Sequence, residues 1–404
     1  MAAGGYRHAP AQPPGLATGG GGVLALLSAS VRLSLTAPVP GQPGEIAAGL
    51  ALPSIPHVLA LVLIAMLPVL WLPAMLCRRL LAAGGAVMTP PTRLAIGLVL
   101  ALCPVAALAG PQRFETPRSD GSAIHWTLDQ LRDATGILLL AQGSGCQSAE
   151  RNANLALTRA ALPSFAALTV EKYGVAPGDD PANDHADCSP TFRRHHTITQ
   201  RVEDAAAVLA ALRGRDWWNG RLVLIGGSEG GDVIARLSAR IEADAAILIS
   251  TGGGKTFGEM VRQSITAEMK RHGVPRDRWP PVERIFGQVR ANPQSSEVWA
   301  GSSFRFWADA IDRRIMDSML ESRTRFLLIQ GGRDVPTPPE LARMVADGFA
   351  SAGRSNLTYW EFPALDHAMT DAQGTSEMKD VLAQAAAWLE TVFETAPAAT
   401  ERHR

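Results

Sequence analysis

The sequence of residues 111–404 predicts an α/β protein in which a mostly parallel sheet is flanked by helices. Short runs rich in Leu, Ile and Val alternate with segments of helical periodicity along this part of the chain. Strands that are apolar throughout and separated by helices are typical of a parallel sheet covered on both faces. The length of 404 residues and the hydrophobic fraction of 47% are sufficient for one large core.

The expected strands and helices alternate in chain order. We expect strands over 123–128, 136–142, 166–171, 222–225, 245–250, 326–330 and 357–362, and helices over 197–212, 232–240 and 376–393. The first of these strands is expected at an edge of the sheet. Residues 254–322 interrupt the alternation with helical patches and aromatic side chains. We interpret this stretch as a helical cap inserted into the sheet domain rather than as a second core.

The first 110 residues differ in composition from the rest of the chain. They contain six charged side chains and are rich in Ala, Gly, Pro and Leu. Residues 1–87 form a low-complexity, apolar leader, in which the run 58–76 is uncharged and long enough to span a bilayer. This leader is either a mis-annotated extension upstream of the true start or a membrane anchor.

Residues 88–109 have the three parts of a secretory signal. After Met88, a positive charge, an apolar run and an Ala-Leu-Ala cleavage site follow one another and end at Ala109. This order predicts a signal peptide that starts at Met88 and is removed before Gly110. The alternative is that 94–109 is a second membrane helix, which forms a hairpin with 58–76.

Both interpretations of the leader place residues 110–404 on the outer side of the inner membrane. In the first, this part is periplasmic or secreted. In the second, it stays anchored, because the arginines between the two apolar runs orient their loop towards the cytoplasm. Cys146 and Cys188 are the only cysteines of this part. An even pair in an oxidising compartment predicts a disulfide, and two free buried thiols are the alternative.

The charge balance and the incompleteness of several motifs argue against nucleic-acid, nucleotide and metal binding. The chain has 38 basic and 38 acidic side chains, whereas a nucleic-acid-binding domain is typically basic. A phosphate-binding loop ending near Lys255 would need glycine at Ile249, and a dinucleotide fingerprint starting at Gly143 would need glycine at Ser148. The acidic run 184–188 lacks a zinc-type repeat. We therefore expect no metal and no organic cofactor.

The run GGSEGG at 226–231 carries the strongest chemical signal. It follows the strand-like LVLI and opens a helix, which is the context of a nucleophile elbow. A serine on such a sharp turn is held in a strained conformation with its hydroxyl exposed, and flanking glycines remove steric clashes. We therefore expect Ser228 to be a nucleophile, with Gly226 and Gly230 as the glycines of the elbow.

A serine nucleophile needs a base, and the base needs an acid that orients it. Asp334 comes just after the strand-like FLLIQ, and His367 comes just after LTYWEF. Both side chains are therefore expected at the same sheet edge as Ser228, in the chain order serine, acid, histidine. Asp366 is the rival acid, but neighbours in sequence rarely face each other, and we favour Asp334.

Two backbone N–H groups are expected to form an oxyanion hole. One belongs to Glu229, the residue after the nucleophile, and the other to the loop that follows the strand 136–142. In that loop we expect the Ser144 amide, with Gly145 as the alternative. A bond between the two cysteines of the domain would brace this loop. Glu229 is also expected to place its carboxylate near the mouth of the pocket.

The ordered motifs GSG, GGSEGG, GGRD and LDH, spread over residues 123–395, resemble the α/β-hydrolase superfamily. The first two are similar to those of bacterial hydrolases related to dienelactone hydrolases and to acyl-CoA thioesterase-type C-terminal domains. The resemblance implies an α/β-hydrolase fold with a cap, and it assigns Ser228 as nucleophile, His367 as base and Asp334 as acid. The loop reads Gln142-Gly143 where many esterases have His-Gly, which leaves the second amide open.

This resemblance implies a serine hydrolase that cleaves a carboxylic ester or thioester of a small-molecule acyl substrate. A peptidase-like amide hydrolase uses the same triad and is the alternative. A catalytically silent binding protein on the same fold is an alternative of another class. The cap aromatics either contact an apolar substrate group or pack against one another; they are Trp299, Phe304, Phe306 and Trp307.

Overall fold

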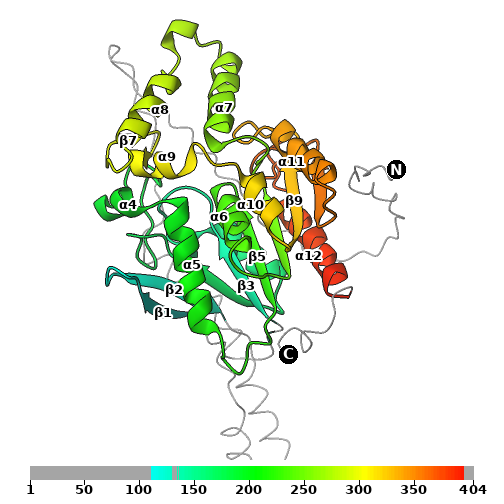
Figure 1. Ribbon diagram of the computed structural model, residues 1–404. Helices are drawn as coiled ribbons and strands as arrows, with labels where there is room; N and C mark the ends of the chain where they lie inside the picture. Colours follow the sequence, from blue (N-terminus) through cyan, green and yellow to red (C-terminus); the bar gives the residue numbers. More distant parts are fainter. Residues whose placement is uncertain (1–110, 130–133, 135, 395–404) are drawn as a thin grey trace, which may run out of the picture. The chain divides into compact units, whose positions relative to one another are not determined.

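The computed structural model describes residues 111–129, 134 and 136–394 (Figure 1). Over these ranges one eight-stranded sheet has the strand order β1-β2-β4-β3-β5-β6-β9-β10. The predicted leader segments 1–87 and 88–109 lie outside the described residues. The strands of the sheet are β1 (Gln112–Pro117), β2 (Ala123–Asp129), β3 (Ile137–Ala141), β4 (Ala166–Val170), β5 (Leu222–Gly227), β6 (Ala245–Ile249), β9 (Arg325–Gly331) and β10 (Leu357–Phe362).

The sheet is mostly parallel, as the apolar strands predict. In the sheet order β4-β3-β5-β6-β9-β10, all neighbouring strands are parallel. Strand β1 pairs with β2, and β2 pairs with β4, in antiparallel register. The expectation that 123–128 is an edge strand is wrong, because β1 covers it. Almost every residue of β1 is exposed, so this strand lacks the apolar pattern that reveals a buried strand.

Ten helices of more than one turn accompany the sheet in the described ranges. They are α3 (Ala153–Ala161), α4 (Pro190–His195), α5 (Ile198–Leu212), α6 (Glu229–Ser238), α7 (Phe257–Arg271), α8 (Val282–Ala291), α9 (Phe304–Ala310), α10 (Ile315–Glu321), α11 (Pro339–Ser351) and α12 (Met378–Glu394). Among the same residues, no helix combines the length and the apolar character needed to cross a membrane.

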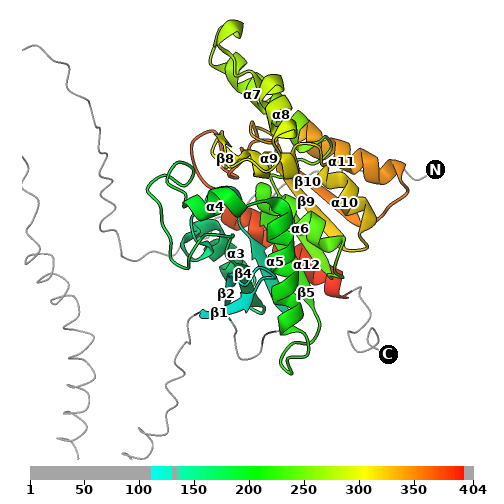
Figure 2. The same cartoon turned by 60° about the vertical axis from the view of Figure 1, so that its left-hand side comes forward.

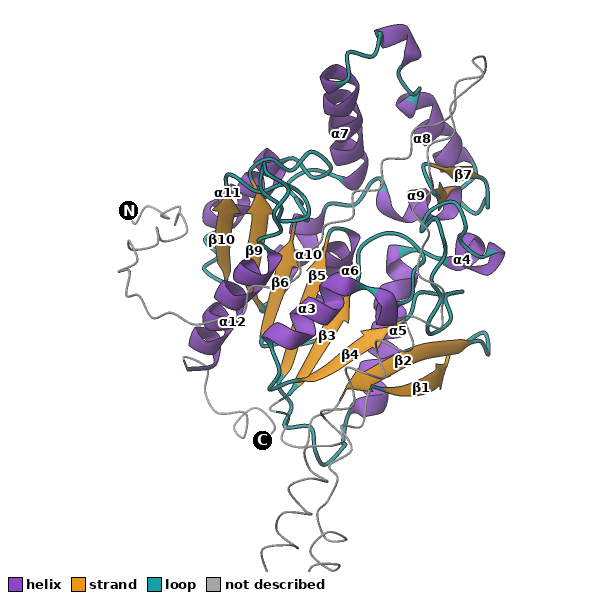
Figure 3. Cartoon of the chain, turned by 180° about the vertical axis from the view of Figure 1, so that it is seen from behind, coloured by secondary structure: helices purple, strands orange, loops and turns teal. Residues whose placement is uncertain are grey.

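Helices cover both faces of the sheet and create two cores. Successive residues of a strand point to opposite faces. Leu139 therefore belongs to one core together with residues of α5, α6 and α11, whereas Leu138 belongs to the other core with residues of α3 and α12. Figure 1 shows α5 and α6 in front of the sheet, and Figure 3 shows α3 and α12 on the other face. Each of the central strands β3, β5 and β6 is therefore buried on both sides.

An insertion between β6 and β9 contains the helices α7 to α10 and a short hairpin of β7 (Val298–Trp299) and β8 (Ser302–Ser303). Its two ends lie side by side, because Thr256 forms a β-bridge with Arg314 and the Gly258 N–H donates to the Ile311 carbonyl at 2.9 Å. Figure 2 shows α7 and α8 projecting away from the sheet. The insertion thus occupies the range expected for the cap.

Candidate active site

Ser228 lies at the turn between β5 and α6, at the carboxyl end of a central strand. Its backbone has φ 52° and ψ −125°, a conformation that costs a non-glycine residue of order 1–3 kcal/mol. The Ser228 N–H donates to the Ile249 carbonyl at 2.9 Å, and the Gly231 N–H donates to the Ser228 carbonyl at 3.0 Å. These bonds hold the strained turn in place, as a nucleophile elbow requires.

The glycines of the elbow are explained by close backbone contacts. A Cβ atom on Gly226 would lie 2.8 Å from the Gly231 nitrogen, and one on Gly230 would lie 2.7 Å from the Gln142 carbonyl oxygen. Real Cβ atoms do not approach backbone atoms this closely, so only glycine fits at both positions. Helix α6 begins at Glu229, earlier than the expected 232, since the two helical glycines weaken the periodic signal.

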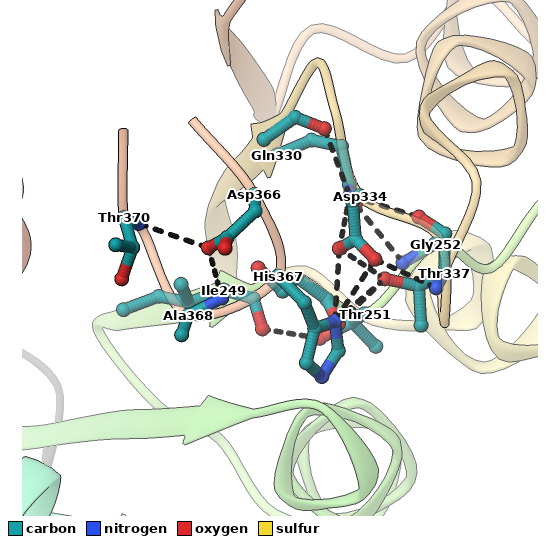
Figure 4. Close-up of polar contacts among 12 residues, drawn as sticks. Ile249, Thr251, Gly252, Gln330, Asp334, Thr337, Asp366, His367, Ala368 and Thr370 are labelled. Carbon is teal, nitrogen blue, oxygen red and sulfur yellow. Dashed lines mark hydrogen bonds and ion pairs between the residues drawn. The ribbon is translucent and has the colours of Figure 1, made fainter. Parts of the chain in front are cut away.

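His367 and Asp334 are in direct contact. The His367 Nδ1 atom lies 2.9 Å from Asp334 Oδ2 and 3.0 Å from Asp334 Oδ1. The Asp334 side chain is completely buried, whereas the His367 side chain is 29% exposed. A buried carboxylate that faces one ring nitrogen fixes the orientation and tautomer of the imidazole and leaves its Nε2 atom for other chemistry. Figure 4 shows the remaining edge of the ring directed away from Asp334.

Two further side chains, neither of which was expected from the sequence, hold the Asp334 carboxylate. Gln330 donates from Nε2 to Asp334 Oδ2 at 2.7 Å. Thr337 donates its N–H to Asp334 Oδ1 at 2.8 Å and its hydroxyl to Oδ2 at 2.5 Å. Gln330 closes an otherwise apolar strand, and a polar residue at that position was the available signal. These hydrogen bonds hold the carboxylate in place behind the imidazole.

The rival acid Asp366 does not face the ring. Its Oδ1 atom accepts hydrogen bonds at 2.9 Å from the backbone N–H groups of Ala368 and Thr370 (Figure 4). Asp366 therefore shapes the loop that carries His367, in the way a short acidic side chain commonly orders a turn.

Ser228, Asp334 and His367 follow β5, β9 and β10 at one edge of the sheet. Strands β5, β6, β9 and β10 are consecutive neighbours in parallel register, so their carboxyl ends meet at this edge. Ser228 is half-buried. Over the described ranges its hydroxyl has no protein hydrogen-bond partner, so Ser228 and His367 are not hydrogen-bonded in the structure.

The loop after β3 lies directly against the elbow. A Cβ atom on Gly143 would lie 3.6 Å from the Ser228 Cβ and 3.4 Å from the Gly227 carbonyl oxygen. Gly143 was not among the expected site residues. A glycine that directly follows a strand ending beside Ser228 was the feature of the sequence that could have identified it. Ser144 is exposed, and Gly145 is buried with φ +90°. The loop that was expected to supply the second amide therefore adjoins the serine.

The expectation that Glu229 presents its carboxylate at the pocket mouth is wrong. The Glu229 side chain is 7% exposed, and its Oε1 atom lies 2.7 Å from Arg201 Nη1 and 3.2 Å from His196 Nε2. Its position in the first turn of α6 directs the carboxylate inward against α5. The Glu229 N–H stays at the helix N-terminus, where no carbonyl of its own helix can reach it.

Buried charged side chains surround this part of the sheet edge. Burial lowers the pKa of the Lys172 ammonium to about 7 and that of His196 to about 4. Burial also raises the pKa of Glu171 to about 7. Burial opposes the ionisation of Glu229 as well, but contact with His196 and the nearby charges of Lys172 and Arg201 hold its pKa below the usual range. Clusters of this kind are frequent at functional sites.

The predicted disulfide between Cys146 and Cys188 is confirmed. Cys146 belongs to the loop after β3, and its N–H donates to the Asp184 carboxylate at 2.6 Å. The two cysteines pack with Val175 and Phe192 in a small apolar cluster. The disulfide and Asp184 therefore attach the far end of the loop to the segment before α4.

A cavity of about 580 Å³ adjoins His367. Its walls include Ile265 and Met269 of α7 and the segment around Val335 after β9. The cap aromatics do not line it. Phe304, Phe306 and Trp307 are buried in the core, and the ring centroids of Trp299 and Trp307 lie 4.8 Å apart. The interpretation that these aromatics pack inside the cap therefore fits the structure.

The chain is similar to several solved structures. No protein-family model and no curated protein matches the chain. The solved structure of Est1E from Butyrivibrio proteoclasticus has 16% identity and a TM-score of 0.47, and the match covers 71% of this chain and 100% of that one. A membrane phospholipase A, described as a bacterial virulence factor, has 16% identity and a TM-score of 0.44, with 81% and 99% covered.

A puromycin-hydrolyzing peptidase from Mycobacterium tuberculosis is a third similar structure. It has 17% identity and a TM-score of 0.48, and the match covers 73% of this chain but 41% of the peptidase.

The fold assignment rests on the geometry of the chain itself. A mostly parallel eight-stranded sheet is described, a strained serine turn joins β5 to α6, and serine, acid and histidine follow β5, β9 and β10 in that order. The described residues therefore have an α/β-hydrolase fold.

Proposed function

We propose that the chain is a serine hydrolase that cleaves a carboxylic ester of a small-molecule acyl substrate, with Ser228, His367 and Asp334 as its catalytic triad. The contact that carries the proposal is the one between His367 Nδ1 and both carboxylate oxygens of Asp334, at 2.9 and 3.0 Å. This pair stands at the same sheet edge as a serine in a strained, half-buried turn. Such a combination supports nucleophilic catalysis.

In the proposed reaction, Ser228 Oγ attacks the ester carbonyl carbon while His367 Nε2 accepts the hydroxyl proton. Asp334 stabilises the resulting imidazolium. The tetrahedral oxyanion accepts hydrogen bonds from the N–H groups of Glu229 and Ser144, and it collapses as His367 returns the proton to the leaving alcohol. Water, deprotonated by His367, then attacks the acyl-enzyme and releases the carboxylic acid and Ser228.

The cavity beside His367 supports a substrate of modest size. Its volume of about 580 Å³ lies within the range of roughly 300–1,000 Å³ that is usual for small-molecule sites. Apolar side chains of α7, Ile265 and Met269, form part of its wall. We propose that the acyl or alcohol group of the ester occupies this cavity while its carbonyl group reaches Ser228.

A fluorophosphonate probe tests the nucleophile on the purified full-length chain. We expect covalent labelling of the wild type at Ser228 and none of Ser228→Ala, with unchanged circular dichroism. Ser264→Ala, which alters another serine that borders the cavity, is the matched control and should keep the labelling. An unlabelled wild type would support a silent binding protein, and equal labelling of Ser228→Ala would exclude Ser228 as the nucleophile.

A substrate panel tests the bond that is cleaved. Short-chain aryl esters, thioesters and aminoacyl amides are supplied to the wild type and to Ser228→Ala at equal concentrations. We expect the highest kcat/KM for esters, and no turnover above background for the variant. A kcat/KM for amides above that for esters would replace the ester proposal by a peptidase-like one and leave the triad intact.

We also propose that residues 110–404 are exported, and the disulfide between Cys146 and Cys188 supports this, since such bonds persist in oxidising compartments. N-terminal sequencing of the product from cell fractions tests the proposal. A start at Gly110 in a periplasmic or secreted fraction is expected for a signal peptide. Retention of 58–76 in the membrane fraction would favour an anchored protein, and a cytoplasmic product with reduced cysteines would contradict export.

A further inference from the structure

Lys172 is a fully buried cation beside the loop after β3. It follows the end of β4 by two residues, and its side chain is among the largest completely buried ones of the described chain. Its Nζ atom donates to the Gly143 carbonyl at 2.6 Å and to the Gly145 carbonyl at 2.5 Å. The ammonium therefore joins two carbonyl groups of one short loop.

This contact determines which way the Ser144 N–H points. The Gly143 carbonyl and the Ser144 N–H belong to one planar, trans peptide unit, in which the two groups point in opposite directions. Since Lys172 holds the carbonyl on the inner side of the loop, the N–H is directed to the opposite side. Ser144 is exposed, and in the described part of the chain nothing accepts a hydrogen bond from its N–H.

The loop also lies directly against the proposed nucleophile. A Cβ atom on Gly143 would lie 3.6 Å from the Ser228 Cβ, so the peptide between Gly143 and Ser144 starts next to Ser228. The N–H of Glu229 leaves the helix N-terminus one residue after Ser228. Two N–H groups without acceptors in their own elements thus flank the serine.

A second buried cation holds the preceding peptide. Arg201 donates from Nη2 to the Gln142 carbonyl at 2.6 Å and from Nη1 to Glu229 Oε1 at 2.7 Å. Arg201 therefore ties the loop to the residue that supplies the other N–H. A buried ammonium is costly to keep without close partners, and the two carbonyls of the loop are the hydrogen-bond acceptors of Lys172.

We propose that Lys172 is a positioning residue that orients the Ser144 N–H into the oxyanion hole. The inference rests on the proposed serine hydrolase and selects Ser144 over Gly145 as the second donor, because Lys172 turns the Gly143 carbonyl inward. Lys172 does not touch the substrate. It acts through the peptide unit, whose N–H has to be in place before the oxyanion forms.

The test is a double-mutant cycle on the full-length chain with Lys172→Met and Ser144→Pro. Methionine fills a similar volume but cannot donate, and proline lacks the N–H. We expect each single variant to lower kcat for an aryl ester by about 10- to 100-fold, with KM changed by less than about twofold, because the lost interaction forms in the transition state. We expect the double variant to be no slower than Ser144→Pro.

An oxyanion mimic gives a second readout that general loosening would not reproduce. An alkyl boronic acid forms a tetrahedral adduct with the serine, and its affinity should fall by the same factor as kcat in Lys172→Met. Arg354→Met is the matched control, since Arg354 also binds backbone carbonyls, at Leu320 and Ser322, in a different region. It should leave kcat and boronate affinity unchanged.

Each outcome decides between the proposals. Unchanged kcat and boronate affinity in a folded Lys172→Met, or strictly additive losses in the cycle, would overturn the role of Lys172 while Ser228 labelling still supports the hydrolase. If Lys172→Met does not fold, Lys172→Arg replaces it, because arginine keeps hydrogen-bond donors but at altered positions. We then expect kcat and boronate affinity to fall by the same factor. Wild-type values of both would overturn the inference. Absent labelling of the wild type would instead remove the proposed function.

Discussion

The His367 ring faces both oxygens of the Asp334 carboxylate, at 2.9 and 3.0 Å from a single nitrogen. The same carboxylate accepts hydrogen bonds from Gln330 and from Thr337. It is thus held from three sides while the imidazole stays partly exposed. A carboxylate fixed in this way can orient the ring without moving during a catalytic cycle.

The first prediction concerns Asp334→Asn. The amide keeps the shape of the carboxylate but favours the wrong tautomer of His367, so we expect kcat for the best ester to fall by about 10³- to 10⁴-fold with the fold retained. Steady-state kinetics and circular dichroism measure the two effects. Asp366→Asn is the matched control, because Asp366 binds the backbone of its own loop. A larger kcat loss in Asp366→Asn than in Asp334→Asn would reverse the assignment of the acid.

The second prediction concerns steric fit at the elbow. In Gly230→Ala the new methyl group would lie 2.7 Å from the Gln142 carbonyl oxygen and closer still to that of Ala141. We expect the free energy of unfolding to fall by about 1–3 kcal/mol, as in other overpacked sites. Gly287→Ala in α8 is the control, since nothing lies within 4 Å of its new methyl group. It should gain up to about 1 kcal/mol from helix propensity.

Urea denaturation of both glycine variants checks these signs. A stability of Gly230→Ala equal to that of the wild type would mean that α6 can move away from the loop after β3. The close approach of the helix to that loop would then not be required for folding.

The third prediction concerns the disulfide. Cys146 and Cys188 are separated by 42 positions, and closing a loop of that length contributes about 4 kcal/mol in the chain-entropy model. We expect the double variant Cys146→Ala, Cys188→Ala to unfold at a clearly lower urea concentration and to lose kcat, because Cys146 belongs to the loop beside Ser228. Wild type treated with a reductant should behave in the same way. Equal urea midpoints with and without reductant would contradict the stabilising role.

The fourth prediction concerns acid stability. Burial lowers the pKa of His196 to about 4, whereas an unfolded histidine has a pKa of about 6.5. Between these values the unfolded chain binds a proton that the folded chain does not, so stability falls as the pH drops from 6.5 towards 4. The difference in pKa corresponds to about 3 kcal/mol when the pH reaches the lower value. Above pH 6.5 the group makes no pH-dependent contribution.

His196→Gln tests this origin of the pH dependence. Glutamine can still donate to Glu229 but does not titrate, so its free energy of unfolding should decrease less between pH 7.5 and pH 4.5 than that of the wild type. Arg201, Lys172 and Glu229 remain in both proteins and contribute equally to the comparison. Identical slopes in the two proteins would show that His196 is not the group responsible.

The sequence predicts the sheet well because its central strands are buried on both faces. Runs such as 222–225 contain no polar residue, and their glycine-rich ends mark the edge where the site lies. Strand β1 could not be predicted from an apolar pattern because nearly all its side chains are exposed. The first turn of α6 could not be predicted because two glycines occupy positions where helix-forming residues would be expected.

The candidate site divides along similar lines. Ser228, Asp334 and His367 can be found from motifs because each follows a recognisable strand. The residues that support them cannot, since Lys, Arg and Glu are read from sequence as exposed. Lys172 and Arg201 are nevertheless buried, and Glu229 turns inward because Arg201 lies behind it. Such pairing depends on which elements meet in space, and spacing along the chain does not encode it.

The two ends of the insertion after β6 lie side by side, and this has a consequence for how the insertion could be exchanged. Thr256 and Arg314 form a bridge at the point where the chain leaves and returns, so the two ends of the intervening segment meet at the start of α7. We expect that α7 and α8 can be replaced by a segment of another length, provided that α9 is kept, because α9 belongs to the same core as α5 and α6. Because α7 contributes to the wall of the cavity beside His367, we expect chimeras joined at Thr256 and Arg314 to change the preferred substrate while they keep the proposed triad.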